Sequence, residues 1–172
     1  FLGCFKQDNV KRAEMALAEG NPSDAANFYS LEINSSQKEG QPVEPKLFLN
    51  AGLAHMEANS FGQATSFLEN ALDSSVDDPE LQSIALNALG NIFYKKTNTW
   101  LDAQNVTEAR KTWNNALAYY DSAFQLNGNQ KAAANLESLK KQIQERIQSL
   151  VTVISGIIWR DMNGDGKIQK IE

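Results

Sequence analysis

The 172-residue sequence contains one cysteine and one histidine, Cys4 and His55. A single cysteine excludes an intramolecular disulfide and a cysteine-based zinc site, and a single histidine excludes a histidine cluster. No apolar run approaches the roughly 20 residues that a membrane-spanning helix requires. The longest apolar stretch, residues 150–159, is too short and is interrupted by Thr, Ser and Gly. The sequence therefore predicts no transmembrane span.

Positive charge is also in deficit. The 16 Lys and Arg residues stand against 21 Asp and Glu residues, which gives a net charge of −5. The Lys and Arg residues are scattered among acids and form no basic stripe of the kind that nucleic-acid-binding proteins carry. We therefore expect no nucleic-acid partner. The 42% hydrophobic content is typical of a globular domain, and the length allows one domain with a sizeable core.

The sequence does contain a repeated pattern of small and large residues. Gly90 follows Gly52 after 38 residues, close to the 34-residue period of helix-turn-helix repeats. We expect small residues where the two helices of a pair approach closely, and large residues in the space between pairs. The small ones are Gly52, Ala64, Ala71, Gly90, Ala116 and Ala123, and the large ones are Phe48, Phe61, Leu68, Tyr120 and Phe124. A weaker copy comes first, with Ala13, Ala16, Ala25 and Tyr29.

This pattern resembles the tetratricopeptide repeat family over residues 6–129. The resemblance implies an all-α solenoid of about three helix pairs, in which each pair buries its apolar face against the next. Phe48 and Leu86 stand where the family usually has Trp. The third repeat carries an insertion, "KTNTWLDAQNVTEARK", which we expect between its helices. This inserted repeat and the "AAANLESLKKQ" after it are similar to the repeat proteins of the bacterial Bat aerotolerance clusters, which implies an exported protein in a larger complex.

The sequence divides into three segments. Residues 1–129 hold the repeats. For residues 130–150 the sequence predicts a long capping helix, because aliphatic residues such as Leu136, Leu139 and Ile143 recur at steps of three and four. This helix would cover the open end of the last pair. In residues 151–172, the stretch "VTVISGIIW" is β-branched, which favours a strand, although the helical period continues to Ile157 and leaves a helix as the alternative.

In tetratricopeptide proteins the first helix of each pair lines a concave groove that binds partner segments, and asparagines hold the ligand backbone. The resemblance implies a non-catalytic scaffold or adaptor with a protein partner. The groove residues would be Asn50, Leu53, Met56 and Glu57 in the second pair, and Asn87, Asn91, Tyr94 and Lys95 in the third. A solvent-exposed polar face is the alternative for the asparagines. We expect His55 to be a packed or groove-facing residue rather than a general base, and so no enzymatic activity.

The last twelve residues match the spacing of an EF-hand calcium loop, in which oxygen ligands alternate around a glycine turn. The expected Ca²⁺ ligands are Asp161, Asn163, Asp165, the Lys167 carbonyl, Gln169 and Glu172, with Gly166 at the turn. A solvated turn without an ion is the alternative. With three acidic ligands and no second loop, we expect weak affinity, on the order of 10⁻⁴ to 10⁻³ M, which suits a site outside the cytosol.

Three further resemblances concern the location and function of the protein. The stretch "ISGIIWRDMNGDG" is similar to the opening of calcium-binding β-sandwich repeats in bacterial surface adhesins, and its loop also resembles dockerin loops. This implies an alternative function as a calcium-dependent structural or adhesion component whose tail begins a β module. The opening "FLGC" resembles the end of a bacterial lipoprotein signal, which makes Cys4 a candidate for a lipid anchor. We expect an extracytoplasmic protein, with a cytoplasmic one as the alternative.

Overall fold

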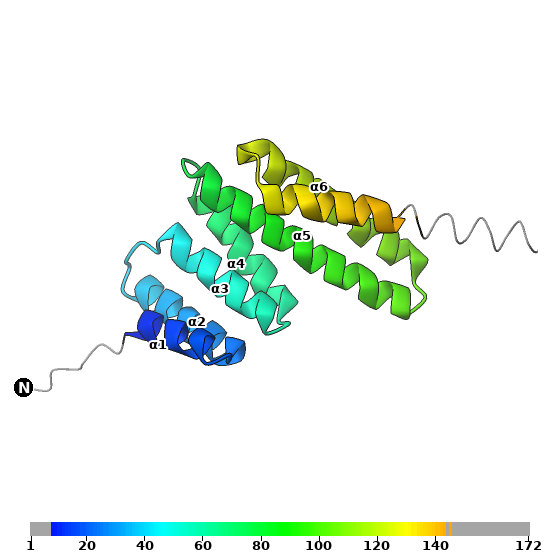
Figure 1. Ribbon diagram of the computed structural model, residues 1–172. Coiled ribbons are helices and arrows are strands. Elements are labelled where there is room, and N and C mark those ends of the chain that lie inside the picture. Colours follow the sequence, from blue (N-terminus) through cyan, green and yellow to red (C-terminus); the bar gives the residue numbers. More distant parts are fainter. Residues whose placement is uncertain (1–7, 144, 146–172) are drawn as a thin grey trace, which may run out of the picture. The chain divides into compact units, whose positions relative to one another are not determined.

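In a computed structural model of the protein, the described residues are 8–143 and 145, and all regular secondary structure among them is helical (Figure 1). This confirms the all-α prediction for this part of the chain. The helices are α1 (Asn9–Ala18), α2 (Pro22–Lys38), α3 (Pro45–Glu57), α4 (Phe61–Ser74), α5 (Pro79–Asp102) and α6 (Val106–Asn127), followed by a helix over residues 130–143. No helix in the described part combines the length and the apolarity that crossing a bilayer would need.

Proline and short polar side chains fix where the helices begin. Pro22, Pro45 and Pro79 occupy the first turn of α2, α3 and α5, where the missing N–H costs nothing and the fixed φ suits the helix. Asp8 caps α1 by accepting a 3.0 Å hydrogen bond from the Lys11 amide. Asp78 caps α5 by accepting a 2.9 Å hydrogen bond from the Leu81 amide. Each cap satisfies an amide that the first helical turn leaves without a partner.

Four helices end in the same way. The residue after the C-cap has a positive φ in α1, α2, α3 and α5, and these residues are Gly20, Gly40, Asn59 and Gln104. The amide of the next residue then bonds back to a carbonyl in the last turn, as in Asn21 N to Ala16 O and Asn105 N to Trp100 O, both 2.8 Å. This is the Schellman arrangement, which turns the chain sharply and brings the following helix back alongside.

Each helix packs against the next one in the chain, and the closest packing is within α1–α2, α3–α4 and α5–α6; α3 also contacts α5. Figure 1 shows these as successive helix pairs. Two of the predicted small residues, Gly52 and Gly90, lie at contacts within pairs, and the four alanines are fully buried. A Cβ atom on Gly52 of α3 would lie 2.6 Å from Cγ of Leu68 in α4, and a Cβ on Gly90 of α5 would collide with the ring of Tyr120 in α6. Glycine at these positions allows the two backbones to approach.

The predicted large residues are buried to different degrees. Leu68 and Tyr120 are 0% and 2% exposed, and Phe48 is also buried. Phe61 is half-buried. Phe124 is an exception, because it is 37% exposed. The expectation that Phe124 fills the space between pairs is therefore wrong, since its position on α6 leaves it partly in solvent.

From the sequence we expected the inserted residues of the third pair to form a separate segment between its two helices. The structure shows that they do not. They lengthen both helices instead: α5 runs on to Asp102 and α6 begins at Val106, with a short turn between them. Within this lengthened part, α5 and α6 contact each other through Thr97 and Thr112, whose hydroxyl oxygens lie 2.8 Å apart in a buried contact. Helix formation satisfies the inserted backbone internally, which an irregular loop of this length could not do.

The chain divides into two compact units, Phe1–Ala133 and Ala134–Glu172, and the helix over residues 130–143 crosses the boundary. The first unit contains α1 to α6. We predicted a helix over residues 130–150. Residues 130–143 are helical, and most of the remaining residues of this range lie outside the described part of the chain. The predicted strand over residues 151–159 also lies outside it.

Candidate functional site

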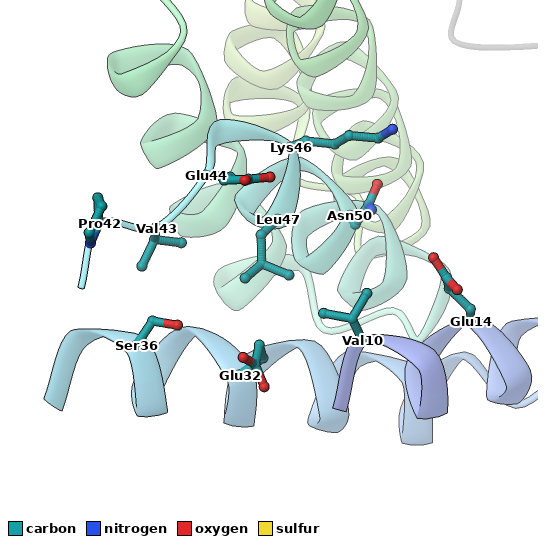
Figure 2. Close-up of a pocket in the computed structure, with 10 residues that line it drawn as sticks. All are labelled: Val10, Glu14, Glu32, Ser36, Pro42, Val43, Glu44, Lys46, Leu47 and Asn50. Atoms are coloured by element: carbon teal, nitrogen blue, oxygen red, sulfur yellow. The ribbon is translucent and has the colours of Figure 1, made fainter. Parts of the chain in front are cut away.

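A groove of about 430 Å³ lies between α1, α2, α3 and the loop that joins α2 to α3 (Figure 2). We call it the α1–α3 groove. It is lined by Val10, Glu14, Glu32, Ser36, Pro42, Val43, Glu44, Lys46, Leu47 and Asn50. One predicted partner-binding residue, Asn50, is among them. Residues 41–44 separate the start of α3 from the end of α2 and supply Pro42, Val43 and Glu44 to the lining.

The groove has an apolar floor and a polar rim. Val10, Val43 and Leu47 are half-buried and pack against the hydrophobic core, and Figure 2 shows Val43 and Leu47 directed toward α2. The polar rim carries three carboxylates and one ammonium group, so its charge is negative. These charged residues are Glu14, Glu32, Glu44 and Lys46. This combination suits a ligand with both an apolar and a cationic part.

Glu32 is the carboxylate that the fold holds most firmly. It is half-buried on α2, and its Oε2 accepts a 3.1 Å hydrogen bond from Nδ2 of Asn9, at the start of α1. This bond joins residues far apart in the sequence and fixes the orientation of the carboxylate at the wall of the groove. Glu14, by contrast, is exposed on α1.

A second hollow of about 310 Å³ lies between the starts of α3 and α5. It is lined by Lys46, Leu49, Asp78, Glu80, Leu81 and Ile84. Lys46 lines both hollows. Asp78 already serves as the N-cap of α5, and Ile84 is 38% exposed. This hollow continues the acidic character of the α1–α3 groove toward the third helix pair.

The other predicted partner-binding residues lie outside both hollows. Leu53 and Met56 of α3 are half-buried and pack against the core. Asn87, Asn91 and Tyr94 of α5 are half-buried, and each takes part in interactions within the protein. These three residues therefore contribute to contacts within the fold. They do not form the fully solvent-exposed polar face that was the alternative to a binding groove.

Asn91 and Lys95 make specific contacts with neighbouring helices. Oδ1 of Asn91 accepts a 2.8 Å hydrogen bond from the hydroxyl of Tyr120 in α6. Burial, with a smaller contribution from Tyr94, raises the pKa of Tyr120, so the hydroxyl stays protonated and donates. Nζ of Lys95 lies 5.5 Å from the ring centroid of Phe61, in a cation–π arrangement that links α5 to α4.

From the sequence we expected His55 to be either packed or facing the groove, and the structure shows that it is packed. Its side chain is 4% exposed, stacks on Phe67 with ring centroids 5.3 Å apart, and shares a 2.9 Å hydrogen bond with Oγ of Ser30 through Nε2. Burial lowers the pKa of His55 below its ordinary value. The imidazole is therefore neutral at pH 7 and links α3 to α2 and α4.

The residues predicted to bind calcium, from Asp161 to Glu172, lie outside the described part of the chain, and so does Cys4. Within residues 8–143, no group of three or more His, Cys, Asp or Glu side chains has the arrangement needed to hold a metal ion. The carboxylates of the α1–α3 groove are not part of such a group.

Sequence reasoning identified Asn50 in the groove but missed Glu32, Val43 and Leu47. One signal was present in the sequence: Glu32 lies three residues after Tyr29, at the position where the later copies of the pattern have Ala71 and Ala123. Neither the comparison with protein families nor the comparison with curated proteins finds a match to this sequence.

Proposed function

We propose that the protein is a non-catalytic interaction module that holds a segment of a protein partner along the face formed by the first helices of its pairs, α1, α3 and α5. The observation that carries this proposal is the α1–α3 groove, with its apolar floor and charged rim. Grooves of this composition provide both buried apolar contact and orienting polar groups, as recognition sites do. Asn50, for which the tetratricopeptide resemblance implies partner binding, lines this groove and so supports the proposal.

The repeated packing supports a tetratricopeptide-like solenoid. Gly52 meets Leu68 and Gly90 meets Tyr120 at equivalent contacts of two successive pairs, and α3 contacts α5 as well as its own partner helix. In such an arrangement each pair presents its first helix on one face. The neutral, packed state of His55 supports a role in stability over one in acid–base catalysis.

We place the protein in an extracytoplasmic bacterial complex. The support comes from the sequence: a calcium loop of weak expected affinity, a lipoprotein-like "FLGC" and the similarity to Bat repeat proteins. A weak calcium site fills at millimolar and not at cytosolic concentrations. A Cys4 lipid would add a membrane anchor to the same assembly.

Site-specific photo-cross-linking in the native source tests the proposal. A photoreactive amino acid replaces Asn50 in the groove, or Asn87 on α5, and a matched variant carries it at Asn70, which is exposed on α4. We expect the first two variants to attach covalently to one defined protein and the Asn70 variant to attach to it at least about tenfold less. Equal yields from all three positions, or no adduct from Asn50 and Asn87, would show that this face does not hold a partner.

A further inference from the structure

The α1–α3 groove lies where the first helix pair departs from the pattern of the later pairs. Glu32 of α2 takes the position of Ala71 in α4 and of Ala123 in α6, and both alanines are 0% exposed. Asn9 of α1 takes the position of Phe48 in α3, which is also buried. Two apolar positions that close the packing in later pairs are thus polar in the first pair.

These two polar residues form one unit. Nδ2 of Asn9 donates a 3.1 Å hydrogen bond to Oε2 of Glu32. A half-buried carboxylate destabilises a fold unless hydrogen bonds compensate for lost hydration, and a carboxylate offers sites for about four such bonds. Asn9 supplies one of them and orients the group beside the groove. Glu32 is therefore a hydrogen-bond acceptor held in one orientation. An alanine, as in the later pairs, would avoid the free-energy cost of partly burying a carboxylate.

The charge of the groove favours a cationic ligand over an anionic one. Three carboxylates and one ammonium group line it, and the groups that could hold a metal ion do not come together in the described residues. A Lys or Arg side chain, in contrast, needs only one well-placed carboxylate. Its methylene stem can lie on apolar surface while its head group reaches that carboxylate. Val10, Val43 and Leu47 provide this surface beside Glu32 (Figure 2).

We propose that the α1–α3 groove binds an extended protein segment through a Lys or Arg side chain that pairs with Glu32, while a neighbouring apolar side chain packs on Val43 and Leu47. This inference rests on the proposed interaction function and adds the chemistry of the partner at this position. The Asn9–Glu32 hydrogen bond positions the carboxylate, so Asn9 is a positioning residue for the contact.

Titration of the ¹⁵N-labelled full chain with a short peptide tests this inference. The peptide is acetyl-Gly-Leu-Arg-Val-Gly-amide, and its matched probe carries citrulline, the neutral analogue of arginine. We expect the arginine peptide to shift the amide signals of Val10, Glu32, Val43 and Leu47, and to bind at least about fivefold more tightly than the citrulline peptide. Glu32→Gln should remove the preference for arginine over citrulline. Glu69→Gln, which makes the same charge change at an exposed position of α4, should leave the preference unchanged.

Equal binding of the two peptides, signal shifts away from the groove, or an arginine preference that survives Glu32→Gln would overturn the inference. So would a lack of binding of the arginine peptide to a wild-type chain whose spectrum shows it to be folded. The cross-linking experiment separates this failure from that of the proposed function. Adducts at Asn50 without charge-selective peptide binding would leave the interaction function in place and refute only the role of Glu32.

Discussion

The hydroxyl of Tyr120 in α6 donates a 2.8 Å hydrogen bond to Oδ1 of Asn91 in α5, while its ring covers Gly90. One side chain thus makes both a polar and an apolar contact between α5 and α6. Asn91 is part of this contact as well as a predicted partner-binding residue. A substitution at Asn91 therefore changes stability in addition to any effect on binding.

We expect Asn91→Ala to lower the free energy of unfolding by about 1–3 kcal/mol, because it leaves the buried hydroxyl of Tyr120 without its acceptor. Tyr120→Phe should cost less, since it removes the donor together with the need for a partner. Urea denaturation of the two single variants and the double variant measures the coupling. Additive losses would show that the hydrogen bond contributes nothing, and an unchanged Asn91→Ala midpoint would contradict the assignment.

Gly52 provides a test of helix-pair packing. A Cβ at this position would lie 2.6 Å from Cγ and 2.8 Å from Cδ2 of Leu68, with the Leu68 backbone nitrogen at 3.2 Å. We expect Gly52→Ala to destabilise the fold by about 1–3 kcal/mol through overpacking, and Gly52→Leu by more.

The matched control is Gly62→Ala in α4, where an added Cβ would meet nothing within 4 Å. Alanine is a better helix former than glycine, so this variant should be neutral or stabilising by up to about 1 kcal/mol. Thermal denaturation of both variants measures the difference. A Gly52→Ala variant as stable as Gly62→Ala would mean that α3 and α4 do not approach as closely as the contact with Leu68 requires.

The pH dependence of stability should report on His55. Burial lowers its pKa from the ordinary value of 6.5, so the unfolded chain binds the proton more readily than the folded chain. Stability is therefore highest above pH 6.5 and falls as the pH drops through 6.5 toward the lower pKa of the folded state. Chemical denaturation between about pH 7.5 and pH 5.5 measures this slope.

His55→Gln removes the titrating group and keeps a side chain able to pair with Oγ of Ser30, which lies 2.9 Å from the imidazole in the native protein. Because the sequence has one histidine, the slope over this pH range should vanish in the variant. A slope of unchanged size would assign the effect to other groups.

The end of α5 offers a stabilising change. Gln104 has a φ of 58°, a left-handed conformation that costs a side-chain-bearing residue about 1 kcal/mol and that glycine adopts freely. We expect Gln104→Gly to raise the free energy of unfolding by about 0.5–1 kcal/mol. Gly128→Ala, at a φ of 68° after α6, should lower it by a similar amount. Calorimetric unfolding that moves in the same direction for both would refute this explanation of the helix ends.

The prediction that residues 161–172 bind Ca²⁺ rests on the spacing of oxygen ligands in the sequence. We expect the full chain to bind Ca²⁺ with a dissociation constant on the order of 10⁻⁴ to 10⁻³ M, and Asp161→Ala with Asp165→Ala to abolish binding by isothermal titration calorimetry. A wild-type chain without a calcium signal would refute the loop assignment. Assembly that collapses when EGTA removes calcium would favour the alternative function as a structural or adhesion component over the scaffold.

The sequence alone determined the helical class and the positions of the close contacts within pairs. Glycine at residues 52 and 90 and proline at three helix starts act through backbone geometry, which is local and so is visible in the order of the residues. Local chemistry did not reveal how the inserted residues would be accommodated. They extended two helices rather than forming a loop, and the lengthened helices contact each other through Thr97 and Thr112.

The candidate site depended on tertiary structure. Asn9 and Glu32 are far apart in sequence and form a pair only when α1 lies against α2, and the floor of the groove takes residues from α1, α3 and the loop before α3. The packing of α6 on α5 likewise brought Tyr120 to Asn91, a residue for which the tetratricopeptide resemblance implied partner binding. Sequence spacing shows which residues share a face of one helix, whereas the neighbouring helix decides which of them remain available to a partner.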